Sequence, residues 1–176
     1  MIDLSTWTNE NSLSLITILF AVLGGVFAYA QWRKSIRLRR SEFINQIIEK
    51  LRFDEDMVKA VYLIDYNDDW YHERFHDESQ EEILIDKLFS YLTYICYLIE
   101  TKNITKREFQ IFDYELRSAC ECPSTQAYLW NLYWFSKSRN SICPFQYLID
   151  YGITHNIISI EDFRKESGKY DQNLDF

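Results

Sequence analysis

Residues 72–76 read His-Glu-Arg-Phe-His, which is the spacing of a zinc peptidase helix. On a helix, side chains four residues apart share a face, so His72 and His76 could hold zinc while Glu73 activates a water molecule. Charged residues crowd the segment, however, and Asp77 has the features of an N-cap for a helix that begins directly after it. We therefore favour a polar loop packed on a helical domain, with a membrane-anchored zinc metallopeptidase as the alternative.

The four cysteines offer a second possible chemistry, at Cys96, Cys120, Cys122 and Cys143. A structural zinc site usually shows two closely spaced ligand pairs, and only Cys120 and Cys122 form one. The chain also has no glycine-rich phosphate loop and no Gly-x-Ser-x-Gly motif. We expect no enzymatic activity, no metal and no cofactor, and we expect the thiols to stay reduced on the cytoplasmic side.

A third group of residues lies at the end of the aromatic segment 127–135 and directly after it. Its cationic and amide side chains could hold a phosphate while an aromatic ring stacks on a base. The alternative is an ordinary solvated helix end. The candidate anion-binding or nucleotide-binding residues are Tyr133, Trp134, Lys137, Arg139 and Asn140.

The elements that position these residues begin with an apolar stretch. Residues 12–30 carry no charge, and roughly 20 residues at about 1.5 Å each cross a hydrocarbon core of about 30 Å. Residues 1–32 contain no Lys or Arg, unlike a cleaved signal peptide. Five basic residues follow and predict that the carboxyl side is cytoplasmic: Arg33, Lys34, Arg37, Arg39 and Arg40. A buried core helix is the alternative.

The basic residues and the apolar span each predict a binding partner. The basic residues are expected to contact lipid headgroups, at about 1 kcal/mol per charge. Small side chains recur along one face of the span and favour close helix packing, so we expect a homo-oligomer. These residues are Ser14, Thr17, Ala21, Gly24, Gly25 and Ala28. Alternatively, they reflect the general abundance of glycine and alanine in membrane helices.

The remainder of the chain is strongly acidic. Residues 41–176 hold 14 basic and 25 acidic residues, a balance of −11. This charge argues against DNA binding, which depends on a basic face. The length suits one compact domain.

Helices are expected throughout this domain, because the whole chain has only four glycines and two prolines. The span should continue as one helix to about Leu51, and Asp54 should cap the next helix. From Asp77 to about Thr101 the apolar spacing predicts the strongest helix. Its core stripe comprises Ile85, Leu88, Leu92, Ile95 and Ile99.

Later helix boundaries have clear local signals. Thr105 and Glu108 form a capping box, and the helix that follows should bury one apolar face. Pro123 should open another helix at its first turn. Residues 144–151 predict a short helix that ends at Gly152.

The predicted fold class is therefore all-α: one N-terminal transmembrane helix that continues into a cytoplasmic helical bundle of about five helices. The expected organisation is an external tail (1–11), a transmembrane helix (12–32), a basic juxtamembrane helix (33–52), a cytoplasmic helical domain (53–165) and a flexible tail (166–176).

This layout over residues 13–152 resembles a group of small bacterial single-pass membrane proteins with a cytoplasmic all-helical domain. The resemblance is carried by the segments 88–92, 104–109, 128–137 and 144–152. The overall plan is similar to anti-phage membrane effectors, such as the type III CRISPR accessory protein that binds cyclic tetra-adenylate. It implies a bacterial inner (plasma) membrane location and a cyclic nucleotide or protein partner.

We therefore expect a non-enzymatic membrane protein with its N-terminus outside. Its cytoplasmic domain would bind a ligand or partner and act through a self-associating membrane helix. Besides the metallopeptidase, a passive membrane scaffold is the alternative.

Overall fold

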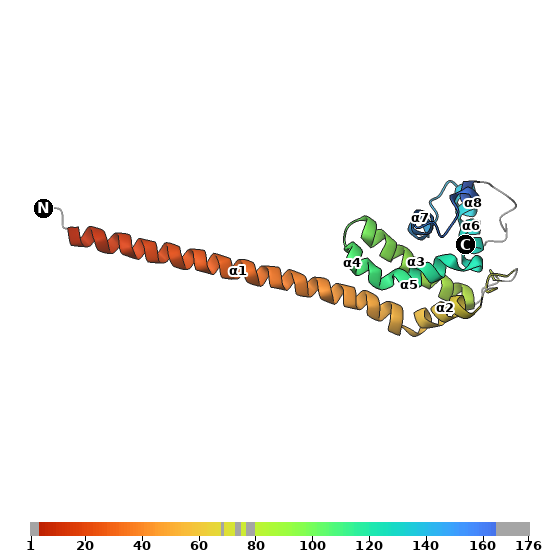
Figure 1. Cartoon of the computed structure of the whole chain (residues 1–176), viewed down its shortest axis with the longest axis horizontal. Coiled ribbons are helices and arrows are strands. Elements are labelled where there is room, and N and C mark those ends of the chain that lie inside the picture. Colours follow the sequence, from red (N-terminus) through yellow and green to blue (C-terminus); the bar gives the residue numbers. More distant parts are fainter. Residues whose placement is uncertain (1–3, 68, 73–74, 77–79, 165–176) are drawn as a thin grey trace. The chain divides into compact units, whose positions relative to one another are not determined.

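The computed structural model describes the backbone of residues 4–67, 69–72, 75–76 and 80–164, and the side chains of these residues apart from 4–13 and 15 (Figure 1). All regular elements in this part of the chain are helical, so the predicted all-α class is confirmed. The chain divides into two compact units, Met1–Ile47 and Ile48–Phe176, and each is described by itself.

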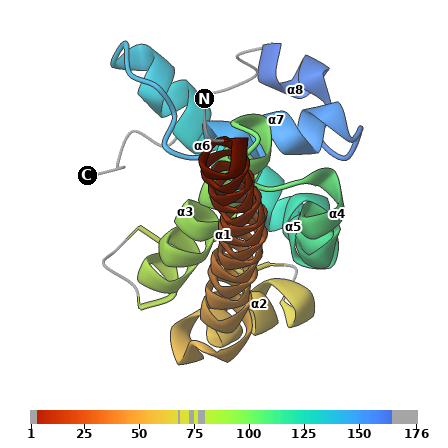
Figure 2. The ribbon, with the colours of Figure 1, turned by 90° about the vertical axis from the view of Figure 1, so that its left-hand side faces the viewer.

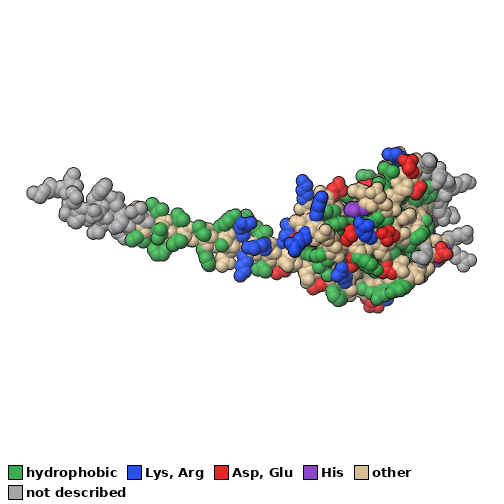
Figure 3. Space-filling model, viewed as in Figure 1, with side chains coloured by type: hydrophobic (Ala, Val, Ile, Leu, Met, Phe, Trp, Pro, Cys, Tyr) green, Lys and Arg blue, Asp and Glu red, His purple; other side chains and the backbone are tan. Residues whose placement is uncertain are grey.

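Helix α1 spans Leu4–Phe53 without a break, which confirms that the apolar stretch and the basic segment share one helix. The helix begins earlier than expected, so most of the predicted external tail belongs to it. Within Ile16–Phe53, α1 is long and apolar enough to cross a membrane by length and composition, and none of its apolar window is buried. Figure 3 shows basic side chains gathered directly after the apolar stretch.

Helix α2 spans Glu55–Tyr66 and is capped by Asp54, as predicted. The Asp54 carboxylate accepts a hydrogen bond from the backbone N–H of Met57 at 3.3 Å. One face of α2 is buried through Met57, Ala60 and Ile64, because residues three to four apart share a helix face. This helix packs against α3 and α5.

Helix α3 spans Gln80–Glu100 and runs through the middle of the second unit, where it packs against α2 and α7. Four residues of the predicted stripe are buried: Ile85, Leu88, Leu92 and Ile95. The fifth, Ile99, is only half-buried, and the preceding Leu98 is buried in its place. The proposed N-cap, Asp77, lies outside the described residues.

The capping box at Thr105 and Glu108 is present. The backbone N–H of Thr105 donates to Glu108 Oε2 at 2.7 Å, and that of Glu108 donates to Thr105 Oγ1 at 3.3 Å. Helix α4 (Lys106–Phe109) passes through a 3₁₀ turn (Gln110–Phe112) into α5 (Asp113–Glu121). The predicted apolar face is buried at Phe109, Phe112, Leu116 and Ala119.

Helix α6 spans Pro123–Ser138 and begins at the predicted proline. It is followed by α7 (Gln146–Thr154) and the short α8 (Ile160–Arg164). Within the second unit, α2 lies at one end and α8 at the other (Figures 1 and 2). Five described helices after α1 have nine or more residues, α2, α3, α5, α6 and α7, which matches the predicted bundle.

Gly152 corrects one prediction, because it lies inside α7 rather than at its end. A Cβ atom at this position would come within 2.5 Å of Ile158 Cδ1. The glycine is therefore needed for the close approach of the returning chain and not for a left-handed helix stop.

Candidate functional site

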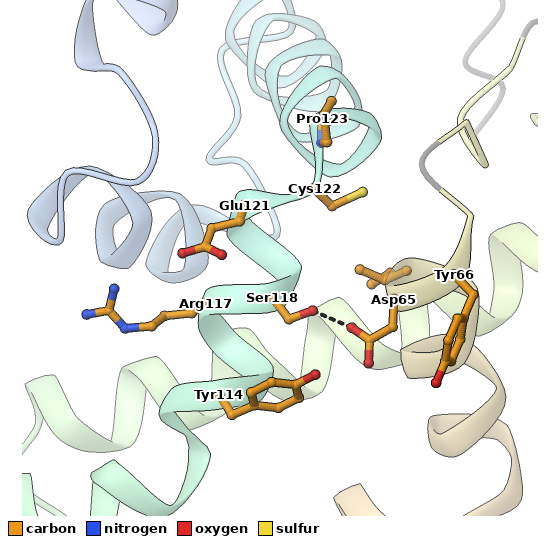
Figure 4. Close-up of a pocket in the computed structure, with 9 residues that line it drawn as sticks. Asp65, Tyr66, Tyr114, Arg117, Ser118, Glu121, Cys122 and Pro123 are labelled. Carbon is orange, nitrogen blue, oxygen red and sulfur yellow. Dashed lines mark hydrogen bonds between the residues drawn. The ribbon is translucent and has the colours of Figure 1, made fainter.

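The site is a groove between α2 and α5, where the structure has a pocket of about 550 Å³ (Figure 4). Its walls include Asp65 and Tyr66 from α2, and Tyr114 and Ser118 from α5. This volume lies within the range of about 300 to 1,000 Å³ that is typical of small-molecule sites.

Two further cavities continue this groove. One of about 310 Å³ is lined by Arg52, Tyr62, Tyr66 and Glu115. The other, of about 10 Å³, lies among apolar side chains together with Glu115. Asp65 lines all three cavities. We call these three adjoining cavities the α2–α5 groove, and all of its residues belong to the unit Ile48–Phe176.

Asp65 is positioned at the groove by helix periodicity and by one hydrogen bond. It follows the buried Ile64, so it lies at the edge of the buried face of α2. The hydroxyl of Ser118 on α5 donates to the Asp65 carboxylate, which ties the two walls together (Figure 4). Among the described residues, no ion pair joins Asp65 to a lysine or arginine. The groove therefore carries a carboxylate that can accept another donor.

Glu115 is the second carboxylate of the groove, and its side chain is only 10% exposed. Its Oε1 atom accepts from Arg52 Nε at 3.0 Å, and Arg52 also donates to the Ile111 carbonyl at 2.9 Å. The Oε2 atom is buried without a hydrogen-bond partner. A buried acceptor left unpaired is costly, so this oxygen marks a place where a donor would be stabilising.

Three tyrosines give the groove an aromatic rim. Tyr62 and Tyr66 lie one turn apart on α2 and stack at a centroid distance of 5.5 Å with 11° between their planes. Tyr66 is 81% exposed and Tyr114, on α5, is 66% exposed. Exposed aromatic surface around a concave site is typical of a binding surface.

Arg117, which lines the pocket of about 550 Å³, is paired with the carboxylate of Asp113. Arg117 Nε donates to Asp113 at 2.9 Å, and Asp113 also accepts from the Tyr151 hydroxyl at 3.0 Å. This hydrogen bond raises the pKa of Arg117, and it lowers the pKa of Asp113. In Figure 4 Arg117 extends away from Asp65. The groove thus presents acidic and aromatic groups rather than a phosphate-binding arginine.

The His-Glu-Arg-Phe-His segment is not helical at its described residues, and Glu73 lies outside them. The helical face that would bring His72 and His76 together is therefore absent at these positions. The favoured prediction of a loop packed on the domain is confirmed, since the Trp70 and Phe75 side chains on either side of His72 are fully buried. In the described part of the chain, no three His, Cys, Asp or Glu residues are grouped to hold a metal.

Both ring nitrogens of His76 already have protein partners. Nδ1 lies 2.7 Å from Glu82 Oε1, and Nε2 lies 3.1 Å from the Tyr71 hydroxyl. Asn131 Nδ2 donates to the same hydroxyl at 2.6 Å. We call Asn131, Tyr71, His76 and Glu82 the His76 network. Sequence reasoning missed it because it joins three separate segments.

A further, half-buried carboxylate lies beside this network. The Tyr128 hydroxyl donates to Asp86, which is one turn after Glu82 on α3. Burial raises the pKa of Asp86, with a smaller contribution from Glu82. Tyr128 is itself fully buried and packs against the rings of both Trp70 and Phe75, at centroid distances of 5.7 and 5.5 Å.

All four cysteines are free and buried. Burial raises the pKa of Cys120 to about 12 and that of Cys143 to about 11, and it raises the pKa of Cys96 as well. These three thiols are therefore protonated at neutral pH, whereas both nucleophilic attack and metal binding require the thiolate.

The structure brings together part of the candidate nucleotide-binding group. The Lys137 ammonium lies 4.9 Å from the Tyr133 ring centroid and 4.8 Å from that of Trp134, and it donates to the Tyr133 hydroxyl at 3.1 Å. Arg139 instead lies over Phe135 at 4.4 Å, and Asn140 occupies the turn that follows with φ of 53°. The aromatic rings are thus covered by the chain's own cations.

The candidate membrane residues all lie on α1. A Cβ atom added at Gly24 or Gly25 would meet nothing within 4 Å, so no contact inside the chain requires these glycines. In the basic segment, the Arg33 guanidinium lies 5.9 Å from the ring centroid of Tyr29.

No known protein family matches this chain, and no curated protein or solved structure is similar to it.

Proposed function

We propose that this chain is a non-enzymatic, single-pass protein of the bacterial inner membrane, with its N-terminus outside. Its cytoplasmic helical domain binds a ligand or partner in the α2–α5 groove. The bound state acts through the self-associating part of α1. The observation that carries the proposal is an exposed apolar stretch, followed at once by five basic residues and joined in one helix to a domain with an open groove.

The exposed apolar side chains support membrane insertion over the role of a core helix. Phe20 is 69% exposed and Phe27 is 67% exposed, and no residue of the apolar window is buried. In water this surface would be far larger than the apolar patches that soluble monomers usually expose. In lipid the same side chains are solvated by acyl chains.

The unbroken helix supports mechanical coupling. α1 runs from the apolar stretch to Phe53, and only Asp54 separates it from α2, which forms one wall of the groove. A ligand can shift the equilibrium between two arrangements of α1 and α2 only by the difference between its binding free energies for those two arrangements. An effector of this kind would respond to its ligand by a change in the association of membrane helices.

Location and orientation are tested together in bacterial cells that express the full chain. We expect the intact protein in the membrane fraction after alkaline carbonate washing. Protease added to spheroplasts should spare the region 53–164, and protease added after permeabilisation should digest it. Recovery from the soluble fraction, or digestion of this region in intact spheroplasts, would overturn the proposal.

Self-association is tested by chemical crosslinking in membranes. We expect crosslinked oligomers of the natural chain and a marked loss with Gly24→Leu combined with Gly25→Leu, because the larger side chains prevent close backbone approach. Val26→Leu combined with Leu19→Phe is the control, since both residues lie on the other side of the helix from the two glycines. Equal crosslinking of the two variants would contradict a glycine-faced interface.

A further inference from the structure

Among the polar groups that line the α2–α5 groove, two carboxylates come from opposite walls. Asp65 comes from α2 and Glu115 from α5, and both line the same two cavities. Asp65 has one donor, Ser118, and Glu115 has one donor group, Arg52. A carboxylate can accept about four hydrogen bonds, so both retain acceptor capacity.

Glu115 is the observation that points to a ligand rather than to an ordinary acidic surface. Its side chain is nine-tenths buried, and Oε2 has no donor. Most buried polar atoms in proteins are paired, so an unpaired carboxylate oxygen on a residue that lines two of the cavities needs a physical explanation. A bound N–H donor supplies one.

The rest of the groove wall is suited to a cation on an aliphatic chain. The rim carries Tyr62, Tyr66 and Tyr114, whose ring faces attract ammonium groups. The small cavity that both carboxylates line also has aliphatic lining, which includes Val61 and Ile64. The groove therefore combines carboxylates and aromatic rings, which can bind a cation, with aliphatic surface.

The net charge of the whole domain also favours a cationic ligand. Residues 48–176 hold 14 basic and 24 acidic residues, a balance of −10. Such a potential concentrates cations and repels phosphates. The cavity volumes suit a small molecule better than a folded partner.

From these observations we propose that the α2–α5 groove binds a short aliphatic polyamine, with one ammonium group at Asp65 and a second directed to Glu115. This inference rests on the proposed binding function of the domain and names the chemical class of its ligand. The alkyl chain lies along Val61 and Ile64, and the tyrosine rim covers the bound cation.

The test is isothermal titration of the full-length protein in uncharged detergent micelles, with putrescine as the probe. We expect saturable binding of one putrescine per chain that weakens with added salt. 1,4-Butanediol has the same chain length without charge and should not bind. Mg²⁺ has the same charge without an alkyl chain and should not displace putrescine at equal concentration.

Two groove variants and one matched control locate the site. Asp65→Asn keeps an acceptor for Ser118 and should weaken putrescine binding by at least about tenfold, which corresponds to about 1.4 kcal/mol. Tyr66→Ala should weaken it by a smaller factor. Glu100→Gln removes the same charge from an exposed position on α3 and should leave the affinity unchanged.

The outcomes separate this inference from the proposed function. Equal losses in Asp65→Asn and Glu100→Gln would show binding to the overall charge and would overturn the groove site. Displacement of putrescine by Mg²⁺, or much tighter binding of a lysine-rich peptide, would overturn the ligand class. If no amine binds while the chain is membrane-inserted and copurifies with another small molecule, only the polyamine inference fails.

Discussion

The helical domain contains two clusters that share the same residue types but differ in how their polar atoms are paired. The His76 network and the α2–α5 groove both combine tyrosines with carboxylates. In the network, both imidazole nitrogens and the Tyr71 hydroxyl have protein partners within 3.1 Å. In the groove, Glu115 has an unpaired buried oxygen, and Tyr66 is 81% exposed.

The difference indicates opposite roles. A closed and satisfied polar network fixes one arrangement of the surrounding core, whereas an unsatisfied group in an open groove is stabilised by something added later. His76, one of the two histidines that attract attention in the sequence, is therefore part of a network that supports the fold. The residues that offer binding capacity, Asp65 and Glu115, belong to no recognisable motif.

The largest expected contrast is between two tyrosines. Tyr128→Ala removes a fully buried ring together with the donor to Asp86, and it should lower the free energy of unfolding by about 3 to 5 kcal/mol. Tyr66→Ala removes an exposed ring and should change it by no more than about 0.5 kcal/mol. Urea unfolding of the two variants, followed by tryptophan fluorescence, measures both. Similar losses would contradict the division into core and groove.

A smaller contrast comes from the hydrogen-bond donors of the two clusters. Asn131→Ala takes a buried donor from the Tyr71 hydroxyl and should cost about 1 to 3 kcal/mol of unfolding free energy. Ser118→Ala removes the donor to Asp65, whose carboxylate borders an open pocket and can be hydrated instead. We expect a cost below about 1 kcal/mol for Ser118→Ala. The same unfolding assay ranks them, and the reverse order would count against a closed network.

Local signals made most of the fold predictable. Asp54, the Thr105 and Glu108 pair and Pro123 each act through neighbouring backbone groups, and all three helix starts are confirmed. The burial of Leu88 and Leu92 follows from helix periodicity alone. The prediction that Gly152 ends its helix was wrong, because the role of this glycine depends on Ile158, which packs against it from outside the helix.

The candidate site was much less predictable. Asp65 and Ser118 are 53 residues apart in the sequence, and only the packing of α2 on α5 brings them together. Glu115 looks like an ordinary charge in the first turn of α5, where acidic residues are common. Its buried, half-paired state depends on tertiary contacts that no local pattern reports.

A pH titration of stability sharpens the comparison on the network side. The pKa of Asp86 is raised from 3.8, chiefly by burial and further by Glu82, while Tyr128 and His76 act against the rise. The folded state thus holds this proton more tightly than the unfolded chain does. Stability should fall as pH rises from about 3.8 through the raised pKa. Asp86→Asn should remove this fall, as measured by urea unfolding across this pH range; an unchanged pH profile would contradict it.

The smallest effect is expected at Asp54, where the sign is opposite. Hydrogen bonds from Lys50 and from the backbone of Met57 lower the pKa of Asp54 to about 2. Its contribution is therefore complete above its ordinary pKa of 3.8 and is lost as pH falls towards 2. Asp54→Asn keeps a good N-cap but cannot titrate. The stability difference between the natural chain and this variant should shrink from pH 4 to pH 2, whereas the difference for Asp86→Asn should grow with rising pH. Two profiles of the same sign would contradict the opposite pKa shifts of Asp86, which is raised chiefly by burial, and Asp54, which is lowered chiefly by its hydrogen bond from Lys50.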